Sequence, residues 1–327
     1  MKPPASLSLD LDNQWSYMKT HGDRGWESFP TYLPLVIPRI LDFLAWRGLT
    51  ISFFVVGQDA ALEVNHEALR ALALAGHEIG NHSFHHEPWL HLYSEAEIEA
   101  EFAAAEAAIE GATGRRPGGF RGPGFSLSAA TLRVLSRRGY RYDASTFPTF
   151  LGPLARAYYF MTARLSAEEK RQRGALFGTL REGLRPNRPY RWALEDGELV
   201  EIPVTTMPLL RVPIHVSYLI FLSGISPALA SAYLATALRL CRMSGTQPSL
   251  LLHSLDFLGH EDVEELAFFP GMGLSAERKL AVVGNAVDQL VAHFRVLTLE
   301  QHAREAAAGG RLQRVIPRFE TPPRPAA

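Results

Sequence analysis

Histidines are concentrated in the eleven residues GHEIGNHSFHH at 76–86, which hold four of them together with a glutamate. His82 and His86 are separated by three residues, and this spacing lets two imidazoles converge on one cation from a helical turn or a tight loop. The same spacing also occurs in hydrogen-bonded pairs inside a packed core. The pair alone therefore leaves metal binding and structural packing open.

Two aspartates end the strand-like segment SLSLDLD at residues 6–12. Side chains alternate along a strand, so Asp10 and Asp12 lie on the same side. The intervening leucines indicate a buried strand, and two buried carboxylates need a cation or a proton. One aspartate together with His82 and His86 would form a facial triad with open coordination positions, which is the arrangement of a catalytic metal.

The surrounding chain alternates between strand and helix patterns that must position these residues. We expect strands at 6–12, 49–57 and 197–205 and helices at 33–48, 94–114 and 275–294. Ser94 and Glu97 have the spacing of a capping box. Repeated strand–helix pairs predict an α/β fold with a parallel sheet or a (β/α) barrel rather than a sandwich. Reactive groups in such folds gather at the C-terminal ends of the strands, where the histidine-rich stretch falls.

Two segments depart from this rhythm within a single expected domain of residues 1–327. Residues 151–195 are rich in arginine and are expected to form a helical insertion. The proline-rich stretch at 315–327 is expected to fray. Neither segment contains the aspartates and histidines singled out above.

Residues 212–238 contain no Asp, Glu, Lys or Arg, and an apolar run of this length suggests a membrane span. However, Pro213, Gly224 and Pro227 interrupt it, and such breakers favour two short helices. We expect an apolar helical segment at 212–241 that lines a pocket. Contact with a lipid or a lipid-linked substrate is the alternative.

The composition of the chain limits the classes of molecule that it is expected to bind. The 327 residues are 47% hydrophobic with a net charge of -1, so the chain can bury a large core but has no global field that would attract nucleic acid or an anionic membrane. The single cysteine, Cys241, excludes an internal disulfide framework and fits a reducing compartment. Residues 1–6 are too short and too polar for a secretory signal. We therefore expect a cytoplasmic protein with no nucleic-acid partner.

Five short motifs follow one another in order: the acidic pair, HSFHH at 82–86, FRGPG at 120–124, YDAS at 142–145 and LLLH at 250–253. This ordered set resembles the five motifs of the polysaccharide deacetylase superfamily, the NodB-homology domain of carbohydrate esterase family four. The resemblance covers roughly residues 6–150 and 197–300. It implies a distorted (β/α) barrel, usually seven-stranded, which hydrolyses an N-acyl amide on a sugar with a divalent metal, most often zinc.

The resemblance implies that Asp12, His82 and His86 hold the metal and that Asp10 is the catalytic base. Water activated by a metal reaches a pKa of about 7, so a nearby carboxylate can take its proton at neutral pH. The family usually has adjacent aspartates followed by glycine, whereas here a leucine separates them and Asn13 stands at the glycine position. A minority branch has this D-x-D form, and it leaves open which aspartate is the base and which is the ligand.

The remaining motifs imply three further roles. Arg121 would pair with the base, because a neighbouring cation keeps a carboxylate ionised. His253 would be the acid that protonates the leaving amine, and Asp143 would hold and tune that histidine. Each residue taken alone also fits a structural role, as a surface arginine, a turn former or a packed histidine.

The implied function is a metal-dependent hydrolase that removes an N-acyl group, acetyl as first choice, from an amino sugar in a cytoplasmic or lipid-linked glycan precursor. The resemblance takes in the aminoarabinose lipid deformylases, which share the D-x-D motif and act on a lipid-linked sugar. Together with the apolar segment 212–241, it favours peripheral contact at the inner membrane face. The alternatives are an allantoinase-like hydrolase of a small amide and a non-catalytic carbohydrate-binding module on the same barrel.

Overall fold

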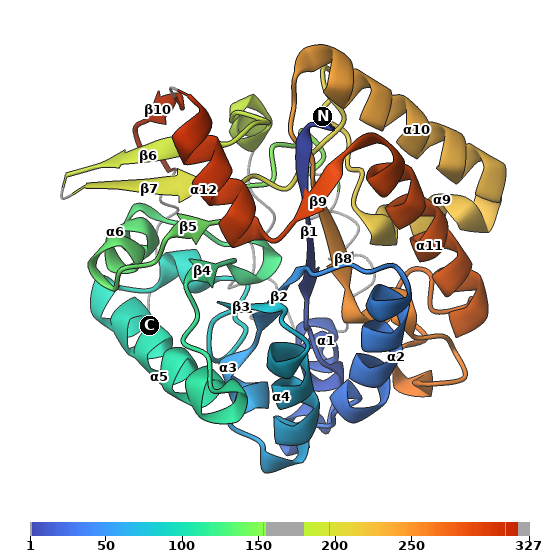
Figure 1. Cartoon of the computed structure of the whole chain (residues 1–327). Coiled ribbons are helices and arrows are strands. Elements are labelled where there is room, and N and C mark those ends of the chain that lie inside the picture. The colour runs from blue at the N-terminus through green and yellow to red at the C-terminus, as the bar shows by residue number, and fades with distance from the viewer. Residues whose placement is uncertain (1, 153, 155–179, 196, 311, 320–327) are drawn as a thin grey trace.

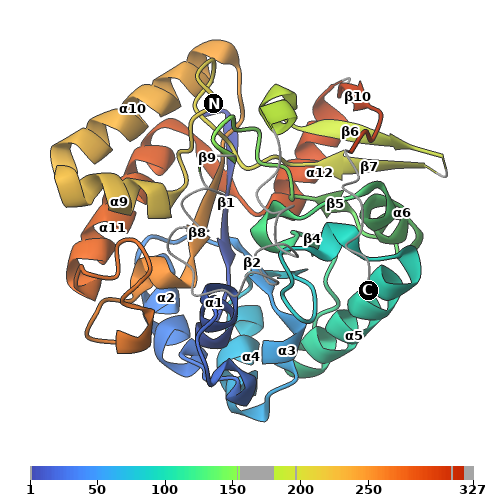
Figure 2. The same ribbon diagram turned by 180° about the vertical axis from the view of Figure 1, so that it is seen from behind.

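The computed structural model describes residues 2–152, 154, 180–195, 197–310 and 312–319 of the chain. Helices surround a central sheet whose strands lie in the middle of the molecule (Figure 1, and from behind in Figure 2). This is the α/β architecture that the alternating strand and helix patterns predict.

The sheet has ten strands. They are β1 (Pro4–Asp10), β2 (Ser52–Val55), β3 (Glu78–Asn81), β4 (Gly119–Phe120), β5 (Tyr142–Asp143), β6 (Tyr190–Leu194), β7 (Gly197–Glu201), β8 (Ser249–His253), β9 (Arg295–Leu297) and β10 (Arg314–Val315). Their order is β10-β6-β7-β5-β4-β3-β2-β1-β8, and β9 pairs with β1 off this path. Neighbours run parallel from β8 through β1 to β5 and β7. This parallel run has the seven strands that the resemblance implies.

The two ends of the parallel run approach each other without a ladder of hydrogen bonds among the described residues. The chain after β7 reaches the start of β8 through a backbone hydrogen bond, in which the amide of Thr205 donates to the carbonyl of Ser249 at 3.0 Å. Beyond β7, the strand β6 pairs antiparallel with it and β10 pairs parallel with β6. The described sheet is therefore mostly parallel and is not a closed barrel.

Helices connect successive strands and cover the outside of the sheet (Figure 1). Ser94 and Glu97 form the expected capping box at the start of the longest of them, α5. The helices are α1 (Gln14–His21), α2 (Leu33–Trp46), α3 (Gly57–Ala60), α4 (His66–Leu74), α5 (Glu95–Thr113), α6 (Ala129–Arg137), α9 (Val216–Ile225), α10 (Pro227–Ser244), α11 (Ala276–His293) and α12 (Leu299–Gly309). The last of these, α12, has no counterpart among the predicted elements.

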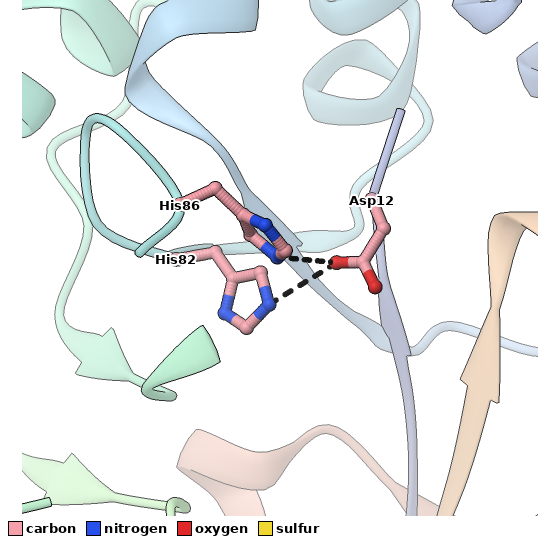
Figure 3. Close-up of side chains that lie close together, drawn as sticks. All are labelled: Asp12, His82 and His86. Carbon is pink, nitrogen blue, oxygen red and sulfur yellow. Dashed lines mark hydrogen bonds and ion pairs between the residues drawn. The ribbon is translucent and has the colours of Figure 1, made fainter. Parts of the chain in front are cut away.

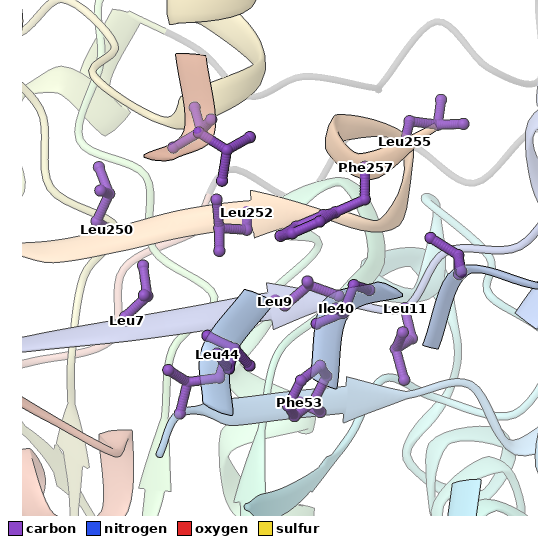
Figure 4. Close-up of a cluster of buried hydrophobic side chains, with 14 of the residues drawn as sticks. Leu7, Leu9, Leu11, Ile40, Leu44, Phe53, Leu250, Leu252, Leu255 and Phe257 are labelled. Carbon is purple, nitrogen blue, oxygen red and sulfur yellow. The ribbon is translucent and has the colours of Figure 1, made fainter. Parts of the chain in front are cut away.

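The strand β1 has one apolar and one polar face, and both are buried. Leu7, Leu9 and Leu11 pack against side chains of β2, β8 and α2 (Figure 4). Ser8 and Asp10 point to the opposite side, because side chains alternate along a strand. Burying the leucine face contributes about 25 cal/mol per Å² of apolar surface and so fixes the register of β1. The direction of the aspartates is fixed with it.

The structure describes only part of the helical insertion expected at 151–195, because 153 and 155–179 lie outside the described residues. The described end is a 3-10 helix at Leu180–Leu184 followed by the strand β6, so its last residues form a strand where helical structure was expected. The strand forms because Tyr190 and Trp192 alternate with less buried residues and pack into a separate apolar cluster. It forms a hairpin with β7, which is shorter than the strand expected at 197–205.

The chain end also differs from expectation over its first residues. Val315 belongs to β10, and the Phe319 ring lies 5.8 Å from the ring of Trp192. These contacts hold the beginning of the stretch that was expected to fray, because they bury apolar surface on β6. Residues 320–327 lie outside the described part of the chain.

The apolar segment expected at 212–241 forms the helices α9 and α10, which are separated at Ser226 and Pro227. With α11 they line a cavity of about 280 Å³. Its walls include Leu219 of α9 and Leu234 of α10, so this segment lines a pocket as expected. No helix within the described ranges is both long enough and apolar enough to cross a membrane.

Candidate active site

Three side chains from two strand ends converge at one edge of the sheet (Figure 3). Asp12 follows β1, and His82 and His86 follow β3. Asp12 Oδ1 lies 3.2 Å from His82 Nε2 and 3.0 Å from His86 Nε2, and one ligand atom from each residue lies within 4.8 Å of the other two. All three residues are buried. The structure thus brings together the residues predicted to hold a metal.

The loop that contains the two histidines is strained and tightly bonded. Ser83 and His86 have φ values of 64° and 53°, a left-handed conformation that residues other than glycine rarely adopt. Asn81 Oδ1 accepts from the Ser83 amide at 2.8 Å, and Glu101 Oε1 accepts from the two intervening amides at 2.9 and 2.7 Å. These bonds offset the backbone strain, which is typical of functional sites.

The backbone carbonyl of Arg121 fixes the ring of His82. It lies 2.6 Å from His82 Nδ1, and because a carbonyl only accepts, Nδ1 holds the hydrogen and Nε2 faces Asp12. An outer partner of this kind orients the ligand in metal sites. His86 Nδ1 is buried and finds no hydrogen-bond partner within the described part of the chain. One carboxylate oxygen and two imidazole nitrogens are a donor set that fits a divalent ion such as zinc.

Opposite charges dominate the electrostatics of this cluster. Burial alone would raise the pKa of Asp12, but the charges of His86 and His82 and their hydrogen bonds hold it well below its usual value. Burial alone would lower the pKa of His82, yet the charges of Asp10 and Asp12 raise it. The cluster therefore attracts positive charge, which a metal ion can supply once the histidines give up their protons.

Asp10 lies beside the cluster and is held by a buried guanidinium. Arg121 Nη1 donates to Asp10 Oδ1 at 2.7 Å and to Ser8 Oγ at 2.9 Å, and its Nε donates to a backbone carbonyl at 2.9 Å. Asp10 Oδ2 is 3.9 Å from His82 Nε2, whereas Asp12 is closer. This geometry favours Asp12 as the ligand and Asp10 as the base.

His253 ends β8 directly beside Asp10. The two residues are register partners in the parallel pair β1 and β8. Because side chains alternate along both strands, register partners of a parallel pair point to the same face of the sheet. The predicted base and the predicted acid thus stand on neighbouring strands at one edge, as the motif order implies.

The predicted pairing of Asp143 with His253 is not seen. No hydrogen bond or ion pair within the described ranges joins them. Instead, Asp143 Oδ1 accepts from Ser145 Oγ at 2.5 Å. Other side chains occupy both groups instead, because Ser145 Oγ donates to Asp143 Oδ1 and Ser217 Oγ contacts His253 Nδ1.

Two residues outside the family motifs contact His253. Ser217 Oγ of α9 lies 3.0 Å from His253 Nδ1. Asp256, in the 3-10 helix η7 (Ser254–Phe257), accepts from the His253 amide at 2.8 Å. Asp256 follows His253 by three residues, which is a capping spacing that the sequence displays. Ser217 has no such signal, because it lies in an apolar stretch that only the fold brings to the site.

Asp143 and Glu201 form a buried carboxyl pair. Glu201 Oε1 accepts from the Thr146 amide at 3.0 Å, and its Oε2 accepts from Trp192 Nε1 at 2.8 Å. Burial, followed by the charge of Asp143, raises the pKa of Glu201 well above its usual value, and burial also raises the pKa of Asp143. These directions favour an uncharged, protonated Glu201.

A further buried acid supports the loop after the first motif. Asp59 Oδ1 accepts from Asn13 Nδ2 at 2.7 Å and from Trp15 Nε1 at 2.8 Å. Burial raises the pKa of Asp59 to about 7. Asn13 also caps α1 through its side-chain oxygen. The asparagine that replaces the family's glycine therefore has a structural use, which the sequence motif alone did not reveal.

Comparisons with known protein sequences agree with this site. Residues 23–142 match the family model described as polysaccharide deacetylase, and this segment includes His82, His86 and Arg121. A peptidoglycan deacetylase of Helicobacter pylori (strain ATCC 700392 / 26695) is 29% identical over 109 residues, which are 33% of this chain and 36% of that protein. The match thus spans about a third of the length of this curated relative.

Solved structures share the fold over most of the chain. A Mycobacterium smegmatis protein assigned to the polysaccharide deacetylases has a TM-score of 0.61 at 21% identity and covers 98% of this chain and 100% of its own. Puue allantoinase has a TM-score of 0.53 at 17% identity and covers 93% and 90%. At these identities the likeness concerns the fold alone.

The partial sequence match and the related peptidoglycan deacetylase both indicate similarity to one class of protein, the deacetylases. Residues 23–142 of the chain match the polysaccharide deacetylase family, as the ordered motifs predict.

The raised pKa of Glu201 predicts that the free energy of unfolding falls as the pH rises. Because the folded pKa of Glu201 is raised, its contribution is fully present below the ordinary value of 4.5 and is lost as the pH rises through the raised pKa. Gln does not titrate, so the free energy of unfolding of Glu201→Gln should decrease less with pH than that of the wild type. Urea unfolding between about pH 5 and about pH 9 measures both slopes.

Glu198→Gln is the matched control, because Glu198 lies on the same strand and is exposed. Its slope should equal that of the wild type. If the free energy of unfolding of Glu201→Gln changes with pH as steeply as that of the wild type, the raised pKa of Glu201 is contradicted.

His82→Ala should weaken zinc binding by more than about 100-fold, because loss of even an outer partner of a metal ligand costs about 10–100-fold. His85→Ala is the control, since the His85 side chain is 56% exposed and pairs with Glu101 rather than with the cluster. Titration calorimetry with zinc on chelator-treated protein measures both affinities. Equal affinities of the two variants would place the metal elsewhere.

Proposed function

We propose that the chain is a metal-dependent deacetylase that hydrolyses an N-acyl group, acetyl as first choice, on an amino sugar. The observation that supports this best is the position of the cluster of Asp12, His82 and His86 next to Asp10 and His253 at one edge of the sheet. The match of residues 23–142 to the polysaccharide deacetylase family supports the same reaction class. A module that only binds carbohydrate has no need for ligands, base and acid together.

A divalent ion, zinc as first choice, would be held by Asp12, His82 and His86. When bound, such an ion polarises the acyl carbonyl, makes a water molecule more acidic and offsets the negative charge that develops on the carbonyl oxygen. The buried ligand set, with His82 already oriented by the Arg121 carbonyl, requires little rearrangement to receive it.

The protein side chains supply the proton transfers. Arg121 occupies Asp10 Oδ1, so Oδ2 is left to take the proton of the attacking water. The guanidinium holds that carboxylate in one orientation, because its Nε is bound to the Ala144 carbonyl. His253 protonates the leaving amine. Its ring is partly exposed, and because Ser217 occupies Nδ1, Nε2 is the nitrogen available for this step.

We further propose that the substrate is a cytoplasmic or lipid-linked glycan precursor at the inner membrane face. Phe221, Ile225 and Leu229 of α9 and α10 are 52%, 71% and 49% exposed, on the helix pair that also contains Ser217. Exposed apolar side chains near a site favour contact with lipid. Cys241 is a free, buried thiol, which is consistent with a reducing compartment.

Asp10→Asn should lower kcat on N-acetylated sugars by about 10²–10⁴-fold while the protein keeps its metal, because the amide cannot act as a base. Asp42→Asn, an exposed position on α2, is the matched control and should retain wild-type activity. Acetate release and metal content of the same samples are the measurements.

Equal activity of Asp10→Asn and the wild type would contradict the assigned base. A folded wild type without any divalent ion or activity would instead favour a carbohydrate-binding module. Hydrolysis of allantoin-like small amides, with none of N-acetyl sugars, would reassign the substrate class.

Phe221→Ser should lower the partition of the protein onto washed inner membranes by about tenfold, because burying a phenylalanine contributes about 1.5–3 kcal/mol. Leu74→Ser, 81% exposed at the end of α4, is the control and should leave partition unchanged. Sedimentation assays give the bound fractions. If the wild type remains entirely in the supernatant, the lipid-linked substrate is wrong.

A further inference from the structure

The imidazole of His253 is one end of a hydrogen-bonded chain that runs through Ser217 to Asp256. Ser217 Oγ lies 3.0 Å from His253 Nδ1 and donates to Asp256 Oδ1 at 2.8 Å. Asp256 Oδ2 accepts from the backbone amide of His253 at 2.8 Å. The three residues form a closed set of contacts that holds both the ring and the backbone of His253.

The number of hydrogens on each group decides which atoms donate and which accept between His253, Ser217 and Asp256. An ionised carboxylate only accepts, and the hydroxyl of Ser217 has a single hydrogen, which therefore goes to Asp256. Only lone pairs of the hydroxyl then face His253. His253 Nδ1 must donate, so the neutral ring is the Nδ1–H tautomer and Nε2 is free.

The carboxylate of Asp256 is buried and anchored from behind. Burial raises the pKa of Asp256, and the charge of His253, its amide, the Ser217 hydroxyl and the charge of Lys279 oppose that rise. Lys279 of α11 is itself buried and donates to the Leu255 carbonyl at 2.9 Å. Because Leu255 precedes Asp256 in η7, this bond fixes the turn on which the carboxylate stands.

A second histidine borders this chain without competing for its proton. The ring centroids of His215, at the start of α9, and His253 lie 6.1 Å apart. Burial, followed by the charge of His253, lowers the pKa of His215 to about 3. His215 is therefore neutral near pH 7, and the Ser217 hydroxyl is the polar partner of His253 Nδ1.

We propose that Ser217 and Asp256 are positioning residues for the acid: their relay keeps one proton on His253 Nδ1, so that the second proton, which the ring takes up from solvent when it becomes imidazolium, lies on Nε2 and passes from there to the leaving amine. The proposal rests on the proposed hydrolase function. It gives Ser217 and Asp256 the supporting role that the motif order assigns to Asp143. It also connects the apolar helix α9 to the chemistry, since Ser217 lies in the first turn of that helix.

The test uses zinc-loaded protein with ¹⁵N-labelled histidine. Long-range ¹⁵N–¹H NMR spectra of the neutral His253 ring should show the Nδ1–H tautomer in the wild type and a mixture in Ser217→Ala. On N-acetyl sugars, Ser217→Ala should lower kcat by about 10–100-fold, the usual effect of losing an outer partner, while KM changes by less than about threefold because Ser217 does not touch substrate.

Three variants make the test specific. Ser217→Thr keeps the hydroxyl and should retain the wild-type tautomer and kcat. Asp256→Asn can donate to Ser217, which reverses the relay, so His253 should shift toward the Nε2–H tautomer. Ser223→Ala removes a hydroxyl of the same helix that donates to the Ile220 carbonyl, and it should change neither readout.

The outcomes separate this inference from the proposed function. An unchanged tautomer and kcat in Ser217→Ala would overturn the relay even if the wild type deacetylates sugars. A tautomer change in Ser217→Ala, in a wild type that hydrolyses no N-acyl sugar, would support the relay and contradict the proposed function. Loss of kcat in Ser217→Thr equal to that of Ser217→Ala would also overturn the relay, since the hydroxyl is then irrelevant.

Discussion

The buried guanidinium of Arg121 is the interaction on which the arrangement of the site depends. A fully buried charge must be paired, and Asp10 supplies the opposite charge while Ser8 accepts a further hydrogen bond. The backbone carbonyl of the same residue accepts from His82 Nδ1. One residue therefore orients both the predicted base and one predicted metal ligand. Asp10 and His82 cannot shift independently, because moving either would leave a buried polar group of Arg121 unpaired.

The parallel sheet adds a second constraint, which connects the site to the core. Asp10 is in register with Phe54 on β2 and with His253 on β8. A slip of β1 by one residue would place a leucine where Asp10 stands and expose the leucine face to a polar interior. The free energy that buries Leu7 and Leu9 therefore also holds Asp10, the proposed base, beside His253, the proposed acid. The strained loop after β3 completes the site, and its strain is offset by hydrogen bonds rather than by glycine.

The sequence was sufficient to predict that Asp12, His82 and His86 lie together. Each residue lies at a strand end, and the strand ends of a parallel sheet meet at one edge. It was not sufficient for Asp143. Ser145 is the partner of Asp143 and Ser217 is the partner of His253, and such pairings depend on packing that no local sequence pattern records. The strand β6 was missed for a related reason, since the arginine-rich composition around it obscured the alternation of Trp192 with its neighbours.

The two halves of the site are held by different physical means. The metal and base half depends on a buried ion pair inside the sheet, and most of it lies within the segment that matches the family model. The half around His253 depends on hydrogen bonds from α9 and η7, outside that segment. A change in α9 that alters the pocket can therefore reach His253 through Ser217 without disturbing Arg121. The chain can therefore vary the surface of α9 beside the proposed acid, while the buried half around Arg121 tolerates little change.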